Sequence, residues 1–209
     1  TRLSRGLGDV YKRQGSTQSQ DIDYLEKQFE KAVDLHEAGN FDQAGSLYKN
    51  LLQINSLNSL LLNSYGTLLY QQGRVSDGAG FIEKSIILNP NASIFFNRMG
   101  VVKRTQGDIV EACKMFERSL LIEEKYEANL NLCETYLNQK CPEAALDPGR
   151  RAVALSPNTF LGHFRLATAL RLLGKFNEAI AEGDKAKSLN PTSPDPYICL
   201  LYTSDAADE

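Results

Sequence analysis

Apolar side chains recur along the chain every three to four residues, which is the spacing of one helix face rather than the alternation of a strand. In one such stretch they stand at Leu62, Tyr65, Leu68 and Leu69. A second amphipathic stretch follows within residues 81–88, after a short break that contains glycine. This pattern predicts an all-α fold built from pairs of antiparallel helices that are joined by tight turns.

The paired stretches recur along the chain with a period near 34 residues. Small residues mark the first stretch of each pair at spacings of 34, 34, 33 and 34, namely Ala32, Gly66, Gly100, Cys133 and Ala167. Seven residues after each comes a turn position, namely Gly39, Gly73, Gly107, Lys140 and Gly174. Five residues later stands another small residue, namely Ala44, Gly78, Ala112, Ala145 and Ala179. The units end at Pro90, Pro157 and Pro191, with Ser56 and Glu124 at the equivalent places.

Each of these series has a physical reason. A small residue on each helix of a pair lets the two backbones cross closely. Glycine at the turn accepts the positive φ that ends the first helix. Asp108 and Asn177 suit the capping of a second helix. Proline after the second helix stops it, because proline cannot continue the hydrogen-bond pattern.

The same residues resemble the tetratricopeptide repeat family. Its small–Gly–aromatic–small–Pro pattern is carried by LHEAGNFDQAGSLYKNLL, LLYQQGRVSDGAGFIEKSIILNP and LRLLGKFNEAIAEGDKAKSLNP. The resemblance gives five repeats, at 25–58, 59–92, 93–125, 126–159 and 160–193, and a truncated sixth from 194. It implies a right-handed superhelical solenoid of about eleven helices, whose first helices line a concave groove.

The two ends of the chain do not continue the repeat. Residues 1–14 and 199–209 look like translated adapter sequence from sequencing-library preparation, so we expect them to be an artefactual leader and tail. The repeat array then occupies 15–198, a fragment without its native start or stop. The alternative is a genuine basic arm and a genuine acidic tail.

The fourth repeat departs from the pattern in two places. Lys140 replaces the turn glycine, and Pro148 and Gly149 lie inside the second helix. Because an interior proline costs about 3 kcal/mol and kinks a helix, we expect local distortion over residues 143–152. Such a kink would widen the groove, and tolerated drift or a sequence error is the other interpretation.

Composition argues against catalysis, metal binding and nucleic acid binding by this fragment. The net charge of −3 provides no basic face for phosphates, and no apolar run approaches the length of a membrane span. His36 lies near a helix end, and His163 is expected to be partly buried in packing. Cys113, Cys133 and Cys141 form no C-x-x-C pair, and their dispersion favours a reducing, cytoplasmic location. We therefore expect no catalytic residue, no metal ligand and no cofactor.

The resemblance also implies where a ligand lies, since family members bind ligands along the concave side of their first helices. The corresponding candidates for a peptide-binding groove are Asn63, Thr67, Tyr70, Asn97, Arg98, Arg104, Asn131, Glu134, Phe164, Arg165, Thr168 and Arg171. Asparagine offers both a donor and an acceptor to a peptide main chain, and arginine binds carboxylates. The alternative is that these residues are merely exposed. The carboxylate clamp of chaperone-binding members is rejected for repeats three to five, because only two of its five positions match.

Two hypotheses for function remain. The first is a scaffold that binds a protein or peptide partner in the concave groove. The second is the substrate-recognition arm of a larger enzyme, because the early repeats are similar to those preceding bacterial protein glycosyltransferases, and similar arms precede sulfotransferase and methyltransferase domains. An uncapped sixth repeat would also leave an apolar end that favours self-association.

Overall fold

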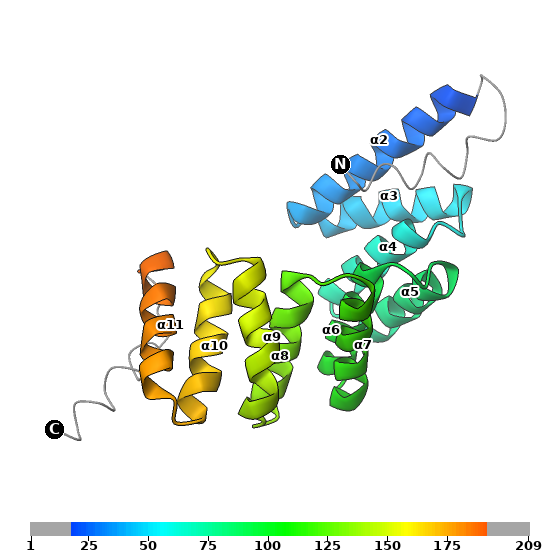
Figure 1. Ribbon diagram of the computed structural model, residues 1–209. Coiled ribbons are helices and arrows are strands. Elements are labelled where there is room, and N and C mark those ends of the chain that lie inside the picture. Colours follow the sequence, from blue (N-terminus) through cyan, green and yellow to red (C-terminus); the bar gives the residue numbers. More distant parts are fainter. Residues whose placement is uncertain (1–17, 192–209) are drawn as a thin grey trace. The chain divides into compact units, whose positions relative to one another are not determined.

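The computed structural model describes residues 18–191, and the side chains from residue 23 onward. Within this range the chain is all-α, with ten helices and no strand (Figure 1). The helices are α2 (Gln18–Glu37), α3 (Phe41–Ile54), α4 (Ser59–Gln71), α5 (Val75–Leu88), α6 (Ser93–Thr105), α7 (Ile109–Ile122), α8 (Tyr126–Asn138), α9 (Pro142–Leu155), α10 (Phe160–Leu172) and α11 (Phe176–Leu189). The expected artefactual ends at 1–14 and 199–209, and the sixth repeat from 194, lie outside the described residues.

The turns between first and second helices share one backbone conformation. The four glycines expected at these turns have φ between 71° and 82°, namely Gly39, Gly73, Gly107 and Gly174. Lys140 takes the fifth turn with a φ of 58°. The Lys140 amide donates to the carbonyl of Leu137, and the Cys141 amide donates to the carbonyl of Tyr136. These are the two hydrogen bonds that end a helix when the next residue is in the left-handed conformation. The turn prediction is confirmed at all five positions.

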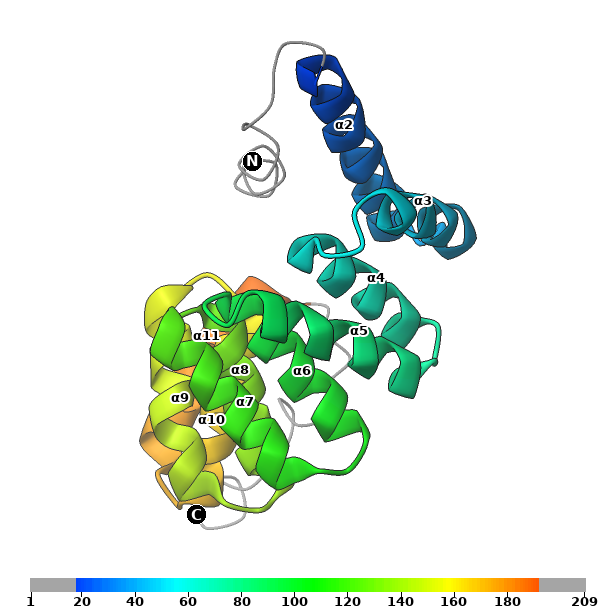
Figure 2. The same ribbon diagram turned by 90° about the vertical axis from the view of Figure 1, so that its right-hand side faces the viewer.

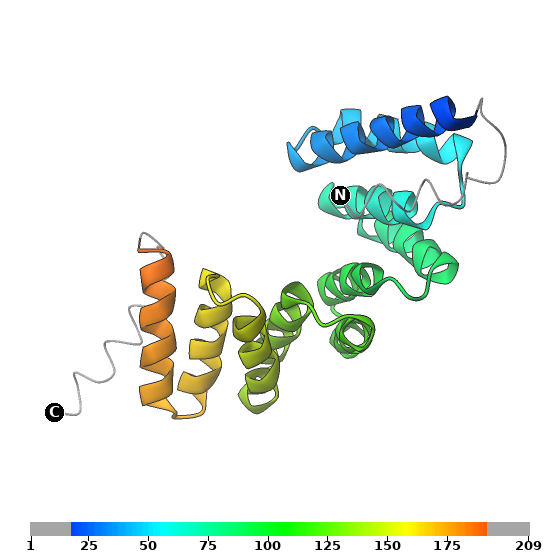
Figure 3. The same cartoon turned by 45° about the horizontal axis from the view of Figure 1, so that its top comes forward.

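The described chain divides into two compact units, and the boundary in the sequence falls between Gln106 and Gly107. In the first unit α2 packs on α3, and α4 on α5 (Figures 2 and 3). The predicted close approach of paired helices is confirmed at Gly66 and Gly78. A Cβ built on Gly78 would lie 2.6 Å from the carbonyl oxygen of Gly66, so neither backbone leaves space for a side chain.

In the second unit α8 packs on α9, and α10 on both α9 and α11. The small residues of the repeat are among its most deeply buried positions. Cys133, Ala145, Ala167 and Ala179 have no exposed surface. The helices therefore meet at the positions that the periodicity marks.

The expected distortion over residues 143–152 is wrong. Helix α9 runs without interruption from Pro142 to Leu155 and has 14 residues, as α3, α5, α7 and α11 do. Pro148 removes only the hydrogen bond to the carbonyl of Ala144, which is an exposed residue open to water. Gly149 is buried, and a Cβ there would lie 3.3 Å from Sγ of Cys133. The Pro–Gly pair thus packs closely within a continuous helix.

Candidate functional site

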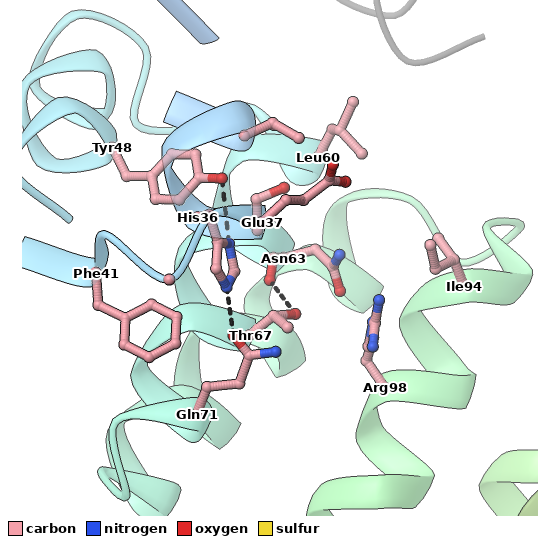
Figure 4. Close-up of a pocket in the computed structure, with 13 residues that line it drawn as sticks. His36, Glu37, Phe41, Tyr48, Leu60, Asn63, Thr67, Gln71, Ile94 and Arg98 are labelled. Atoms are coloured by element: carbon pink, nitrogen blue, oxygen red, sulfur yellow. Dashed lines mark hydrogen bonds between the residues drawn. The ribbon is translucent and has the colours of Figure 1, made fainter. Parts of the chain in front are cut away.

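A pocket of about 350 Å³ opens in the first unit among the first helices α2, α4 and α6 (Figure 4). It is lined by Val33, His36, Glu37, Gly39, Phe41, Tyr48, Leu60, Asn63, Ser64, Thr67, Gln71, Ile94 and Arg98. Three of the residues predicted from the sequence meet there, namely Asn63, Thr67 and Arg98. The pocket joins apolar side chains to a few polar groups, which is the usual composition of a binding site.

Asn63 is one of the polar residues that line this pocket. It lies on α4 and is only 4 % exposed. Its side-chain oxygen Oδ1 is buried and has no hydrogen-bond partner among the described residues. A buried acceptor left without a partner costs about 1–3 kcal/mol. One turn later, the Thr67 hydroxyl donates to the main-chain oxygen of Asn63 at 2.8 Å, so Thr67 does not satisfy the amide.

One wall of the pocket is held by His36, in the last turn of α2. Its Nε2 donates to Oε1 of Gln71 on α4, at 2.5 Å. Its Nδ1 lies 3.4 Å from the hydroxyl of Tyr48. Burial, with a smaller contribution from Glu37, raises the pKa of Tyr48, so its hydroxyl stays protonated and donates to Nδ1. The rings of Phe41 and Tyr48 meet the imidazole edge-on, at centroid distances of 5.8 and 6.0 Å.

Arg98 stands on the other side of the pocket, on α6. Its side chain is exposed and makes no hydrogen bond or ion pair within residues 18–191. Figure 4 shows its guanidinium and the Asn63 amide pointing toward one another. Glu37, on α2, carries the other formal charge of the lining. The pocket therefore presents an unpaired cation, an unpaired acceptor and apolar side chains such as Leu60 and Ile94.

The remaining candidates of the first unit lie outside this pocket. The Tyr70 hydroxyl is 2.9 Å from Oγ1 of Thr105, which ties α4 to α6. Asn97 and Arg104 are half-buried and have partners within the protein. None of these three candidates lines the pocket.

In the second unit the candidates interact mainly with one another. Arg165 on α10 donates to Oε1 of Glu134 on α8 at 2.8 Å. Its guanidinium also lies 5.3 Å from the ring centroid of Phe164. Phe164 is only 4 % exposed and stacks on Phe160, so its ring belongs to the interior. The Thr168 hydroxyl donates to the main-chain oxygen of Phe164. Asn131 and Arg171 are half-buried.

The comparisons with known proteins identify the repeat. Residues 29–93, which include most of the pocket, match the model of the tetratricopeptide repeat. Residues 29–93 carry tetratricopeptide repeats. No curated protein matches the chain.

Solved structures, a tetratricopeptide protein among them, share the fold at low sequence identity. YrrB, described as a tetratricopeptide protein with an unusual peptide-binding site, is 21 % identical, with a TM-score of 0.67 over 78 % of this chain and 85 % of that one. PilW, a type IV pilus biogenesis factor, is 17 % identical, with a TM-score of 0.75 over 85 % of this chain and 82 % of that one. MamA is 17 % identical, with a TM-score of 0.67 over 77 % and 94 %. These similarities establish the architecture.

Outside the pocket, several polar residues of the described chain have structural partners, although Oδ1 of Asn129 is also buried without one there. His163 is buried, with Nδ1 2.6 Å from Oε2 of Glu182 on α11 and Nε2 2.8 Å from the carbonyl oxygen of Pro157. It therefore joins α11 to the turn before α10. Burial raises the pKa of the Cys133 thiol to about 12. Among residues 18–191, no three His, Cys, Asp or Glu side chains are placed to hold a metal ion, and no helix is long and apolar enough to cross a membrane.

The sequence pattern predicts only part of the pocket. The position of His36 near a helix end does not reveal its contact with Gln71, which lies 35 positions away. Tyr48 and Phe41 lie on α3, a second helix, whereas the expectation from the family places ligands along the first helices alone. The repeat period itself could have suggested His36, because it stands one turn before Gly39 and so faces the next first helix.

Proposed function

We propose that the chain is a tetratricopeptide scaffold that binds a polypeptide partner, and that the pocket among α2, α4 and α6 holds part of an extended segment. The observation that carries this proposal is the buried, unpartnered Oδ1 of Asn63 in the wall of the pocket. A main-chain N–H is the donor that an extended peptide offers at every residue other than proline. One such group would remove the penalty at Asn63.

The shape and lining of the pocket support the same proposal. A volume of about 350 Å³ lies at the lower end of ligand pockets, so it suits one or two side chains better than a large cofactor. Leu60 and Ile94 offer apolar contact beside the amide. The hydrogen bonds of His36 to Gln71 and Tyr48 hold the wall in place before a ligand arrives, which lowers the entropic cost of binding.

The test is a selection of peptides from a random display library against the full chain. Enriched peptides should bind the Asn63→Ala variant about fivefold more weakly, because a net hydrogen bond contributes about 1 kcal/mol and 1.4 kcal/mol is tenfold. The matched control is Asn138→Ala, an exposed asparagine at the end of α8 that should leave affinity unchanged. A library without enrichment, or peptides that bind Asn63→Ala as well as the parent chain, would remove the proposal.

A further inference from the structure

Two arginines occupy the same position in their repeats but have different surroundings. Arg98 is the sixth residue of α6, which begins at Ser93, and Arg165 is the sixth residue of α10, which begins at Phe160. Arg165 forms an ion pair of 2.8 Å with Glu134, which precedes it by 31 residues on the neighbouring first helix. The residue 31 positions before Arg98 is Thr67.

Thr67 cannot do for Arg98 what Glu134 does for Arg165. It carries no charge, and its hydroxyl donates to the main-chain oxygen of Asn63. Arg98 has no ion-pair or hydrogen-bond partner in the described part of the chain. Glu37, the other charged residue of the lining, lies on α2 and makes no ion pair with Arg98 there. Of these two arginines, Arg98 at the pocket therefore lacks the internal carboxylate that Arg165 has.

We propose that an acidic side chain of the bound segment pairs with Arg98, in the way that Glu134 pairs with Arg165. This inference rests on the proposed function and specifies its ligand as an acidic, extended polypeptide segment. A main-chain N–H of the segment donates to Oδ1 of Asn63, and an aliphatic neighbour of the acidic residue contacts Leu60 and Ile94. A guanidinium binds a carboxylate through two parallel hydrogen bonds, so the preference over an amide side chain is strong.

The charges of the pocket also orient the segment. Arg98 lies on α6 and Glu37 on α2, with α4 between them in the lining. The acidic residue therefore lies toward α6, and a neutral or basic residue lies toward α2. Because the ion pair is accessible to water, its contribution should weaken as salt increases.

The experiment uses three pools of end-blocked nonapeptides, with the central residue fixed as Asp, Asn or Lys and the other positions random. Binding to the full chain is followed by fluorescence anisotropy. The Asp pool should bind about tenfold more tightly than the Asn pool, because a hydrogen bond to a charged group contributes about 1.5–3 kcal/mol before solvent screening.

The decisive variant is Thr67→Glu, which supplies Arg98 with the internal carboxylate that Arg165 already has. It should abolish the preference for Asp over Asn, whereas the matched Thr67→Gln, of the same size without charge, should retain it. Arg98→Glu should reverse the order, so that the Lys pool binds best. Circular dichroism of each variant verifies that the helices are intact.

The outcomes separate the two proposals. If the pools bind equally well but all lose affinity in Asn63→Ala, the acidic ligand is wrong and the peptide-binding function stands. If Thr67→Glu and Thr67→Gln show the same preference between the Asp and Asn pools, Arg98 does not bind the acidic residue and the inference fails. It also fails if Arg98→Glu leaves the preference for Asp unchanged. If no pool binds and the display library gives no enrichment, the proposed function itself fails.

Discussion

Replacing Lys140 with glycine should stabilise the second unit, because the turn holds a lysine in a backbone conformation that suits glycine. Its φ of 58° lies in the left-handed region, as do those of the four turn glycines. A residue with a Cβ pays about 1–2 kcal/mol there. Glycine lowers the free energy of unfolding by about 0.4–1 kcal/mol, because it gives the unfolded chain more conformational freedom. The net gain of Lys140→Gly should therefore be about 1 kcal/mol.

The other turns show that this cost comes from the backbone alone. A Cβ built on Gly73 has no atom within 4 Å, and the same holds for Gly39, Gly107 and Gly174. Gly73→Ala should accordingly lower the free energy of unfolding by about 1 kcal/mol without a steric clash. Lys140→Ala keeps the Cβ and removes the charge, so it should leave stability unchanged.

Urea denaturation followed by circular dichroism measures these differences, and amide hydrogen exchange at residues 126–155 assigns those of the Lys140 variants to the fourth repeat. Local exchange matters because repeat arrays lose cooperativity between neighbours. The reasoning is refuted if Lys140→Gly is no more stable than the parent chain, or if Lys140→Ala destabilises as much as Gly73→Ala does. The second result would mean that the lysine side chain itself contributes to the turn.

Three further predictions concern packing, a buried histidine and a buried thiol. Gly78→Ala should lower the free energy of unfolding by about 2 kcal/mol in urea titration, because its Cβ would meet backbone atoms at 2.6 and 2.9 Å. Gly80→Ala lies on the same helix and its Cβ would have no atom within 4 Å, so it should raise the free energy of unfolding by up to about 1 kcal/mol. His163→Ala should lower the free energy of unfolding by about 1–3 kcal/mol, because the buried imidazole no longer bonds the half-buried carboxylate of Glu182 and the carbonyl of Pro157; an unchanged midpoint would contradict the geometry. In the folded chain at pH 8, exposed Cys141 should react with iodoacetamide and buried Cys133 should not. The raised pKa of about 12 keeps the Cys133 thiol protonated until far higher pH. Labelled Cys133, identified by mass mapping, would contradict this prediction.

Local features of the fold could be predicted from the sequence because each has a local cause. The period places Lys140 where four glycines stand elsewhere, and the structure gives it the same positive φ. The small residues Gly66 and Gly78 stand where two backbones cross. Such positions are set by one helix pair, so a single repeat contains the information.

Features that depend on long-range contacts could not be predicted. The effect of Pro148 depends on whether the carbonyl it leaves unpaired is exposed, and only the packed helix shows that Ala144 is. The pair of Arg165 with Glu134 and the contact of His36 with Gln71 join neighbouring repeats, whose side-chain register the period does not fix. Right-handedness, cytoplasmic location, self-association through a sixth repeat and attachment to a larger enzyme stay predictions.

The central claim is that a polypeptide binds at the amide of Asn63. The most direct measurement is nuclear magnetic resonance of the ¹⁵N-labelled full chain, in which the side-chain amide signal of Asn63 is followed during titration with a library-selected peptide. The account predicts a saturable shift of that signal together with the backbone amides of Leu60, Thr67 and Arg98, and no shift at Asn138. Saturable binding that leaves the Asn63 signal unmoved would contradict it.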